Sequence, residues 1–484
     1  MQTSTIQPVR ENDLLTRLTL LVSQSFFLGL MLGLMIVAAI ALLLSIYGSD
    51  TLPYVYITVA ILGALSFYGF AEVQRRWSLV QVSSVSILII ISFLAFAWTG
   101  LAFIGWNWLA FAAMVAFPLI MQVGFVILGS QAGRLLDVRQ IKRHFPRIIG
   151  GFVVGFIVAG ALVTPIQIGF GNTESLLLAA AVSGGLMLSM LLLTNGRYRA
   201  LLAQSSPDGQ AVDPPPLRRL LTKRFVLLIF AYQMLTAMVI QLMDFMVLSA
   251  TGARFTNSDE LALFMGNLTV VINVTDLLFL ALLAGLLISR LGLRFGLIAK
   301  SAVNILFLAS VIAAGFITGQ ETALFFWLVI IARIFDIIFT DGTTRPSTNA
   351  TYQALPAHER VAVQTGVEGI GAPVALGLAG VLLLIFEALG GINLVTVAVV
   401  ALLLAFLLFA VALLVFRSYG RNLLRTMRRR ALDPGQLSLE DTGLAVTQRL
   451  LSSKQLSDVR LGLDVLQGTG HPSLSEELLK LSGS

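Results

Sequence analysis

Long apolar segments alternate with short polar ones along most of the chain. A helix needs about 20 apolar residues to cross the hydrocarbon core of a bilayer, and it satisfies its own backbone hydrogen bonds there. The pattern therefore predicts twelve transmembrane helices, over residues 18–46, 55–71, 79–99, 108–128, 148–168, 176–193, 225–250, 268–288, 295–317, 323–340, 370–389 and 392–416.

The composition excludes a soluble globular protein. Hydrophobic residues make up 57% of the 484 positions and charged residues only 12%, and the mean hydropathy is +0.90. Such a chain cannot cover itself with polar surface in water. The lipid bilayer is therefore its expected solvent and first partner.

Basic residues fall on one side of this ladder of segments. Of the 32 Lys and Arg residues, only Arg254 lies in a connection on the other side. Cytoplasmic loops retain Lys and Arg during insertion. We therefore expect a multi-pass protein of the cell inner (plasma) membrane with both termini in the cytoplasm. The net charge of +7 is explained by loops beside anionic head groups, so no nucleic acid partner is expected.

Chemistry-bearing motifs for catalysis are missing from the sequence. The chain has no cysteine, and its three histidines, His144, His358 and His471, lie far apart in polar stretches. No metal site, cofactor or enzymatic activity is predicted, since Gly-rich phosphate loops and nucleophile triads are also absent. The polar first 17 residues lead into an apolar stretch too long for a signal peptide, so the first helix should be retained.

A polar connection divides the chain. Residues 195–224 contain SSPDGQAVDPPP and then a basic run, which is linker composition. We therefore expect an all-α membrane protein with six-helix bundles at 1–194 and 225–416. Residues 417–484 should form a basic helix and a short soluble helical tail.

The connection between the eighth and ninth segments carries a motif. Gly285 is followed by Arg290, Gly292 and Arg294, with Ser289 at the usual position of an acid. This pattern resembles the loop signature of the major facilitator superfamily. The resemblance implies two bundles with an inner gate at these residues, joined by Arg345 at the inner mouth. The alternative is that Arg290 and Arg294 are only positive-inside anchors.

Several further stretches are similar to ATP/ADP nucleotide transporters, and most closely to their bacterial relatives that carry C-terminal HEAT repeats. The matching runs are LPYVYI at 52–57, LDVRQIKRHFP at 136–146, DELALFMG at 259–266, RP at 345–346 and LPAHER at 355–360. The run SDVRLGLDVLQGTGHPSLSEELLKL in the tail resembles a HEAT repeat, which implies a possible protein partner there. Two positions depart from the family, because Gln131 stands where an acid is expected and Leu248 where relatives often have Lys.

Five ionisable residues are candidates for charges at membrane depth. They are Asp244, Asp276, Arg333, Asp336 and Glu368. Intramembrane charges are unfavourable unless they are paired or face water. We predict a cluster of Asp276, Arg333 and Asp336 that binds an anionic or zwitterionic solute, with a carboxylate accepting a coupling proton.

Alternatives remain for each of these groups. The cluster could be a structural ion pair between helices. Asp244 could be a solvated or capping residue near the outer end, and Glu368 could be hydrated at the mouth. Lys300 should reach the inner surface by snorkelling. The amides are expected to form interhelical hydrogen bonds, at Gln122, Gln233, Gln241, Asn273 and Asn304.

The resulting hypothesis is a secondary transporter of the major facilitator type, working by alternating access on a nucleotide or another anionic or zwitterionic solute. The alternative is a transport-inactive membrane anchor or sensor that signals through its HEAT-like tail.

Overall fold

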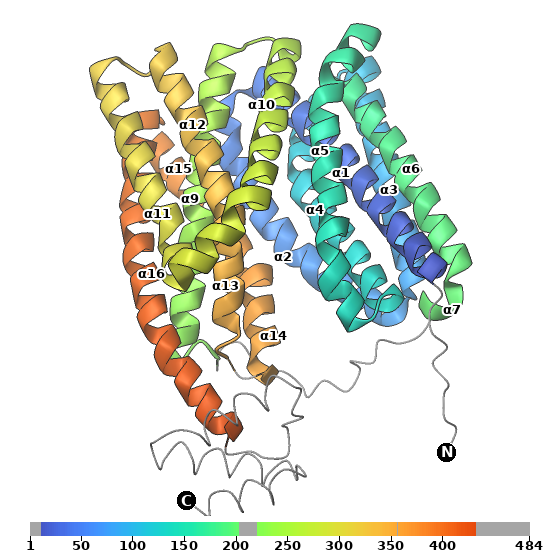
Figure 1. The fold of residues 1–484 in the computed structure, drawn as a ribbon. Coiled ribbons are helices and arrows are strands. Elements are labelled where there is room, and N and C mark those ends of the chain that lie inside the picture. Colours follow the sequence, from blue (N-terminus) through green and yellow to red (C-terminus); the bar gives the residue numbers. More distant parts are fainter. Residues whose placement is uncertain (1–10, 203–219, 356, 432–484) are drawn as a thin grey trace, which may run out of the picture.

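The protein is helical throughout the part that the structure describes. A computed structural model describes residues 11–202, 220–355 and 357–431, and contains no strand within them (Figure 1). Ten of its helical segments are long and apolar enough to cross a membrane. The prediction of an all-α fold is confirmed. The proposed HEAT-like tail lies outside the described residues.

The first group of helices packs around α1, which is the most buried of the ten segments. Its elements are α1 (Glu11–Tyr47), η1 (Ser49–Thr51), α2 (Leu52–Arg76), α3 (Leu79–Thr99), η2 (Gly100–Ile104), α4 (Trp108–Leu135), α5 (Val138–Phe170), α6 (Ser175–Arg197) and α7 (Arg199–Leu202).

The second group begins after the linker and contains three π-turns between or within its helices, counting only described residues. Its elements are α9 (Arg224–Arg254), α10 (Ser258–Phe279), η3 (Leu280–Ala284), α11 (Gly285–Ile317), α12 (Ala323–Phe339), η4 (Thr340–Thr344), α13 (Arg345–Tyr352), α14 (Ala357–Gly366), η5 (Val367–Gly371), α15 (Ala372–Ala388) and α16 (Leu394–Ala431).

The π-turns of the second group are η3, η4 and η5, and a further one, η2, follows α3 in the first group.

Helix starts are set by local capping. At α5, the Asp137 carboxylate accepts from the Gln140 backbone N–H at 2.8 Å, and the Gln140 side chain accepts from the Asp137 N–H at 3.2 Å. This capping box satisfies N–H groups that the first turn leaves free.

Glycines allow α1 and α5 to pack closely. A Cβ at Gly29 would collide with the backbone carbonyl of Phe152, and one at Gly155 with that of Phe26. Small residues permit this approach of backbones in a membrane protein, where packing rather than the hydrophobic effect holds helices together.

The two groups meet mainly along two helix pairs. α5 packs against α10, and α2 packs against α15. A Cβ at Gly160 would lie 2.5 Å from the carbonyl oxygen of Gly266, and one at Gly380 would lie 2.8 Å from that of Pro53. These close approaches bring the two groups together around the site described below.

The connection between α10 and α11 contains a sharp break. Gly292 has a φ of 74°, inside what is otherwise continuous helix. This left-handed conformation strains residues that have a Cβ and suits glycine. The backbone therefore turns at Gly292 and separates Gly285, Arg290 and Arg294 into two helical stretches.

Apart from Arg254, the described connections that carry Lys or Arg lie at one end of the molecule, where α1 begins and α16 ends (bottom of Figure 1). We call it the basic end. The other end, which holds the short connections after α1, α5, α9, α11 and α15, is called the opposite end.

Candidate functional site

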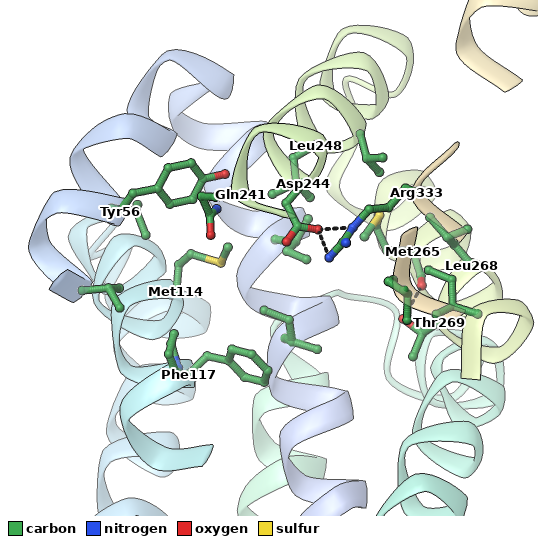
Figure 2. A pocket seen from close by; sticks show the side chains of 18 of the residues that line it. Tyr56, Met114, Phe117, Gln241, Asp244, Leu248, Met265, Leu268, Thr269 and Arg333 are labelled. Atoms are coloured by element: carbon green, nitrogen blue, oxygen red, sulfur yellow. Dashed lines mark hydrogen bonds and ion pairs between the residues drawn. The ribbon is translucent and has the colours of Figure 1, made fainter. Parts of the chain in front are cut away.

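A cavity of about 360 Å³ lies between the two groups of helices. Side chains from α1, α2, α4 and α5 form one wall, and side chains from α9, α10, α12 and α15 form the other (Figure 2). Most of the lining is apolar. Its polar members are Tyr56, Gln241, Asp244, Thr269, Asn273 and Arg333.

An ion pair joins α9 to α12 at this cavity. The Arg333 Nε and Nη2 atoms both lie 2.7 Å from Asp244 Oδ1. The Asp244 side chain is 37% exposed, whereas Arg333 is only 11% exposed. Asp244 is therefore the member of the pair that the cavity reaches most easily, as Figure 2 shows.

The same arginine holds a second carboxylate behind the cavity wall. Arg333 Nη1 donates to Asp336 Oδ2 at 2.5 Å. Asp336 is fully buried, and its Oδ1 accepts from Lys300 Nζ at 2.9 Å and from Asn304 Nδ2 at 2.7 Å. Because Lys300 and Asn304 lie on α11, this carboxylate ties α11 to α12.

The buried network is electrically balanced. Two carboxylates, Asp244 and Asp336, face two cations, Arg333 and Lys300, and Lys300 also donates to the Thr340 hydroxyl at 2.6 Å. An isolated buried charge is very unfavourable, and hydrogen-bonded pairing offsets most of that penalty. The four charges should therefore be stable together and unstable when one is removed.

A second cavity of about 670 Å³ adjoins the first and lies nearer the basic end. It is lined by residues of α2, α4, α9, α14 and α15, and it shares Val59, Pro118, Gln241 and Leu376 with the first cavity. Its polar lining includes Gln122, Gln241 and Thr365 but no charged side chain among the described residues. The two cavities are therefore neighbours between the helix groups.

Polar contacts close the opposite end. The Thr173 hydroxyl donates to Asp259 Oδ1 at 2.5 Å, and Gln167 Nε2 donates to the Asp259 carbonyl at 3.3 Å. Ser249 and Ser49 are hydrogen-bonded at 3.2 Å. These hydrogen bonds join the first group of helices to the second at the opposite end.

We expect Thr173→Val to loosen the opposite end, because it removes the donor to Asp259 and keeps the side-chain shape. The net effect of one such hydrogen bond corresponds to about a threefold to tenfold larger open population. Distances between spin labels on α5 and α10 measure that population. Ser189→Ala is the control, because that hydroxyl bonds only its own helix; an unchanged population in Thr173→Val would show that the contact does not hold the end closed.

The predicted cluster is corrected in one member. Arg333 and Asp336 are paired as expected, but their further carboxylate partner is Asp244 and not Asp276. Asp276 lies on α10, is 6% exposed and lines neither cavity; its Oδ1 has no partner among the described residues. Asp244 is therefore a cavity residue and not a helix cap.

Lys300 also differs from expectation. It does not snorkel to the surface, because its side chain is completely buried and paired with Asp336. The sequence signal for this position was the spacing of Lys300 and Asn304, because residues four apart lie on the same helix face. Together the two residues form a polar face on α11 that matches Asp336.

Gln131 lies away from both cavities. It is fully buried on α4 and donates to Asn195 on α6 at 3.4 Å. Asn195 in turn donates to Ser84 on α3 at 3.2 Å. Gln131 is therefore part of a link between three helices of the first group, and its placement offers no contact to a solute in either cavity.

The predicted inner-gate residues lie at the basic end. Arg290 and Arg294 are exposed, and neither makes an ion pair within the residues that the structure describes. Arg345 pairs with Asp341 at 3.0 Å, with its side chain 71% exposed. Glu368 belongs to η5, and its side chain lies outside the described part.

Three amides expected to link helices have other surroundings. Gln241 lines both cavities, Gln122 lines the second, and Asn273 lines the first while donating to the Thr269 carbonyl of its own helix at 2.8 Å. Asn304 does link α11 to α12, as predicted. Sequence reasoning also missed Tyr56, whose ring lies beside Gln241 (Figure 2).

The chain shares its fold with solved transporter structures. No family model and no curated protein matches the sequence. A one-residue mutant of the nucleoside transporter NupG has a TM-score of 0.63 at 14% identity, covering 83% of this chain and 100% of that chain. NupG without that change has a TM-score of 0.57 at 15% identity, covering 83% and 98%. A POT family transporter in complex with a thioalcohol-conjugated peptide has a TM-score of 0.59 at 13% identity, covering 83% and 96%.

These comparisons establish the fold. The chain has the fold of major-facilitator-type transporters, as predicted, and the similar structures are transporters rather than enzymes. They do not support the expected membership of the ATP/ADP transporter family, nor the HEAT-repeat tail.

Proposed function

We propose that the protein is a secondary transporter that works by alternating access. One observation carries this proposal: a cavity with a charged pair lies between two helix groups that hydrogen bonds join at the opposite end. A solute site that is closed on one side and approachable from the other is the arrangement that rocking transporters require.

The proposal includes twelve membrane crossings. The segment Ser258–Ile317 is 60 residues long, which corresponds to about 90 Å of helix against a hydrocarbon core of about 30 Å. It must therefore cross twice, turning near Gly292. Adding α2, which has 25 residues, gives twelve crossings, grouped as six at 1–194 and six at 225–416.

Orientation follows from charge. The basic end should face the cytoplasm, because Lys and Arg are retained there. The structure then represents a state that is closed toward the outside, with the second cavity on the cytoplasmic side of the first. In the other state, the basic end would close and the contacts of Thr173, Gln167 and Asp259 would separate.

The pairing of charges in this network limits the negative charge that a solute in the cavity can carry. A nucleotide carries several negative charges and needs several unpaired cations. Arg333 is already bonded to two carboxylates, and Lys300 lies behind the wall. A small solute without several negative charges fits this cavity better than a polyanion. Nucleosides and peptides, which are named for the similar structures, are reasonable first probes.

Arg333→Ala should reduce uptake to background, because it leaves Asp244 and Asp336 facing each other's charge without their shared partner. A thermal-shift screen with nucleosides, peptides, amino acids, amines and sugars would identify a ligand, since binding to the folded form raises the Tm. Uptake of that ligand into proteoliposomes is then compared between the native protein and the variant.

Arg197→Ala is the matched control, because it makes the same change on α6, away from both cavities. Full uptake by Arg333→Ala would remove the pair from the mechanism. Binding without uptake in the native protein would instead favour the membrane anchor or sensor.

A further inference from the structure

The first cavity presents an unpaired carboxylate oxygen, while the one cation in its described lining is neutralised by two carboxylates. This observation deepens the proposed function, and it rests on that proposal only in treating the cavity as a solute site. Tyr56 and Gln241 add neutral polar groups to the lining.

Each nitrogen atom of Arg333 already donates to a carboxylate. Nε and Nη2 donate to Asp244, and Nη1 donates to Asp336. The side chain is 11% exposed. An anionic solute would therefore meet a guanidinium whose charge is already neutralised by two carboxylates at 2.5 to 2.7 Å.

Asp244 retains an open oxygen. Both Arg333 contacts are made to its Oδ1, and its Oδ2 has no hydrogen-bond partner among the residues that the structure describes. Figure 2 shows the second oxygen directed away from Arg333, on the side of Met114 and Gln241. A carboxylate oxygen accepts its strongest hydrogen bonds from charged donors.

The backbone of α4 adds a further hydrogen-bond acceptor. Pro118 lies within α4 and has no N–H, so the Met114 carbonyl one turn earlier lacks its usual helical donor. Met114 lines the cavity. On α10, the Thr269 hydroxyl donates to the Met265 carbonyl at 2.8 Å, and Asn273 Nδ2 donates to the Thr269 carbonyl at 2.8 Å. These donors are therefore engaged within their own helix.

We propose that this cavity takes an amphipathic amine. The protonated nitrogen would donate to Asp244 Oδ2, and the apolar body would lie against Phe117 and the aliphatic side chains around it. Phe117 offers an aromatic face to an alkyl or aromatic body. The cavity volume of about 360 Å³ falls in the range of small-molecule sites.

Binding of three compounds with one apolar body tests this assignment. The purified full-length protein is titrated with 3-phenylpropylamine, 3-phenylpropan-1-ol and 3-phenylpropionate, and the Tm is followed. The amine should bind at least about tenfold more tightly than the alcohol and the acid, because a charged donor to a carboxylate is the strongest of the three contacts.

Variants distinguish the effect of the Asp244 charge from an effect on folding. Asp244→Asn should weaken amine binding by about tenfold to a hundredfold while leaving the alcohol unchanged. Asp244→Glu should retain the preference for the amine. Asp276→Asn, the same change at a buried carboxylate outside both cavities, should have no effect. Pro118→Ala should weaken amine binding by about threefold, because it gives the Met114 carbonyl a donor.

The proposal fails if the alcohol or acid binds as tightly as the amine, if none of the three binds, or if Asp244→Asn leaves amine binding unchanged. Transport is measured separately. Amine binding without uptake into proteoliposomes would uphold the ligand class and contradict the transport function. Uptake of another solute without amine binding would uphold the transport function and contradict the ligand class.

Discussion

Replacing Asp336 with Asn should destabilise the folded protein by about 3–5 kcal/mol. The substitution keeps the side-chain shape but leaves Lys300 and Arg333 with one carboxylate, Asp244, between them. Lys300 is completely buried, and its remaining partner would be the Thr340 hydroxyl. The loss in the free energy of unfolding comes from this uncompensated buried cation. The small contribution of an ion pair exposed to water would not account for it.

A second substitution tests that reason. Lys300→Met alone should also destabilise the protein, because Asp336 then loses one of its two cations. Combining Lys300→Met with Asp336→Asn removes one charge of each sign and restores neutrality around Asp244 and Arg333. The double variant should therefore recover at least half of the stability lost in Asp336→Asn, as a double-mutant cycle would reveal.

The measurement is thermal or denaturant unfolding in detergent. Asp341→Asn serves as the control, since Asp341 and Arg345 form a pair with an exposed arginine that should contribute less than about 1 kcal/mol. The electrostatic explanation is wrong if Asp336→Asn destabilises the protein as little as this control does. It is also wrong if the double variant is no more stable than Asp336→Asn alone.

Gly160→Ala should shift the protein strongly away from the state described here. A Cβ at this position would lie 2.5 Å from the Gly266 carbonyl oxygen and 2.8 Å from Val270 Cγ2. The first neighbour is backbone and cannot rotate away. Overpacking of this kind is unfavourable by about 1–3 kcal/mol, which corresponds to roughly a 5- to 150-fold change in the equilibrium.

Separation of α5 from α10 relieves the clash, so the opposite end should open. The chain contains no cysteine, which allows spin labels at Ile168→Cys on α5 and Glu260→Cys on α10 without other changes. The distance between them should lengthen in Gly160→Ala. Gly185→Ala is the control, because a Cβ there meets no atom within 4 Å; equal distances in the two variants would contradict the prediction.

The helices were predictable from the sequence because each apolar segment must bury itself in lipid. The segment 79–99 agrees with α3 at both ends, where Ser78 and Gln81 form a capping box. Other helices extend beyond the apolar pattern. α5 begins at Val138, ten residues before the predicted start, because Asp137 caps it and its polar first turns continue as helix into the basic end.

The site was predictable only in part. The spacing of Arg333 and Asp336 places them on one helix face, so their pairing followed from α12 alone. The choice between Asp244 and Asp276 depends on how α9 and α10 are rotated about α12. No local pattern gives that rotation. Lys300 was placed at the surface because its long side chain could reach water, whereas the fold turns it toward Asp336.

The central claim is that the two helix groups rock about the cavity. Two doubly labelled proteins test it: Ile168→Cys with Glu260→Cys at the opposite end, and Arg143→Cys with Gln353→Cys at the basic end, each with and without Gly160→Ala. The account predicts that the first distance lengthens while the second shortens. Lengthening at the opposite end with an unchanged distance at the basic end would contradict it.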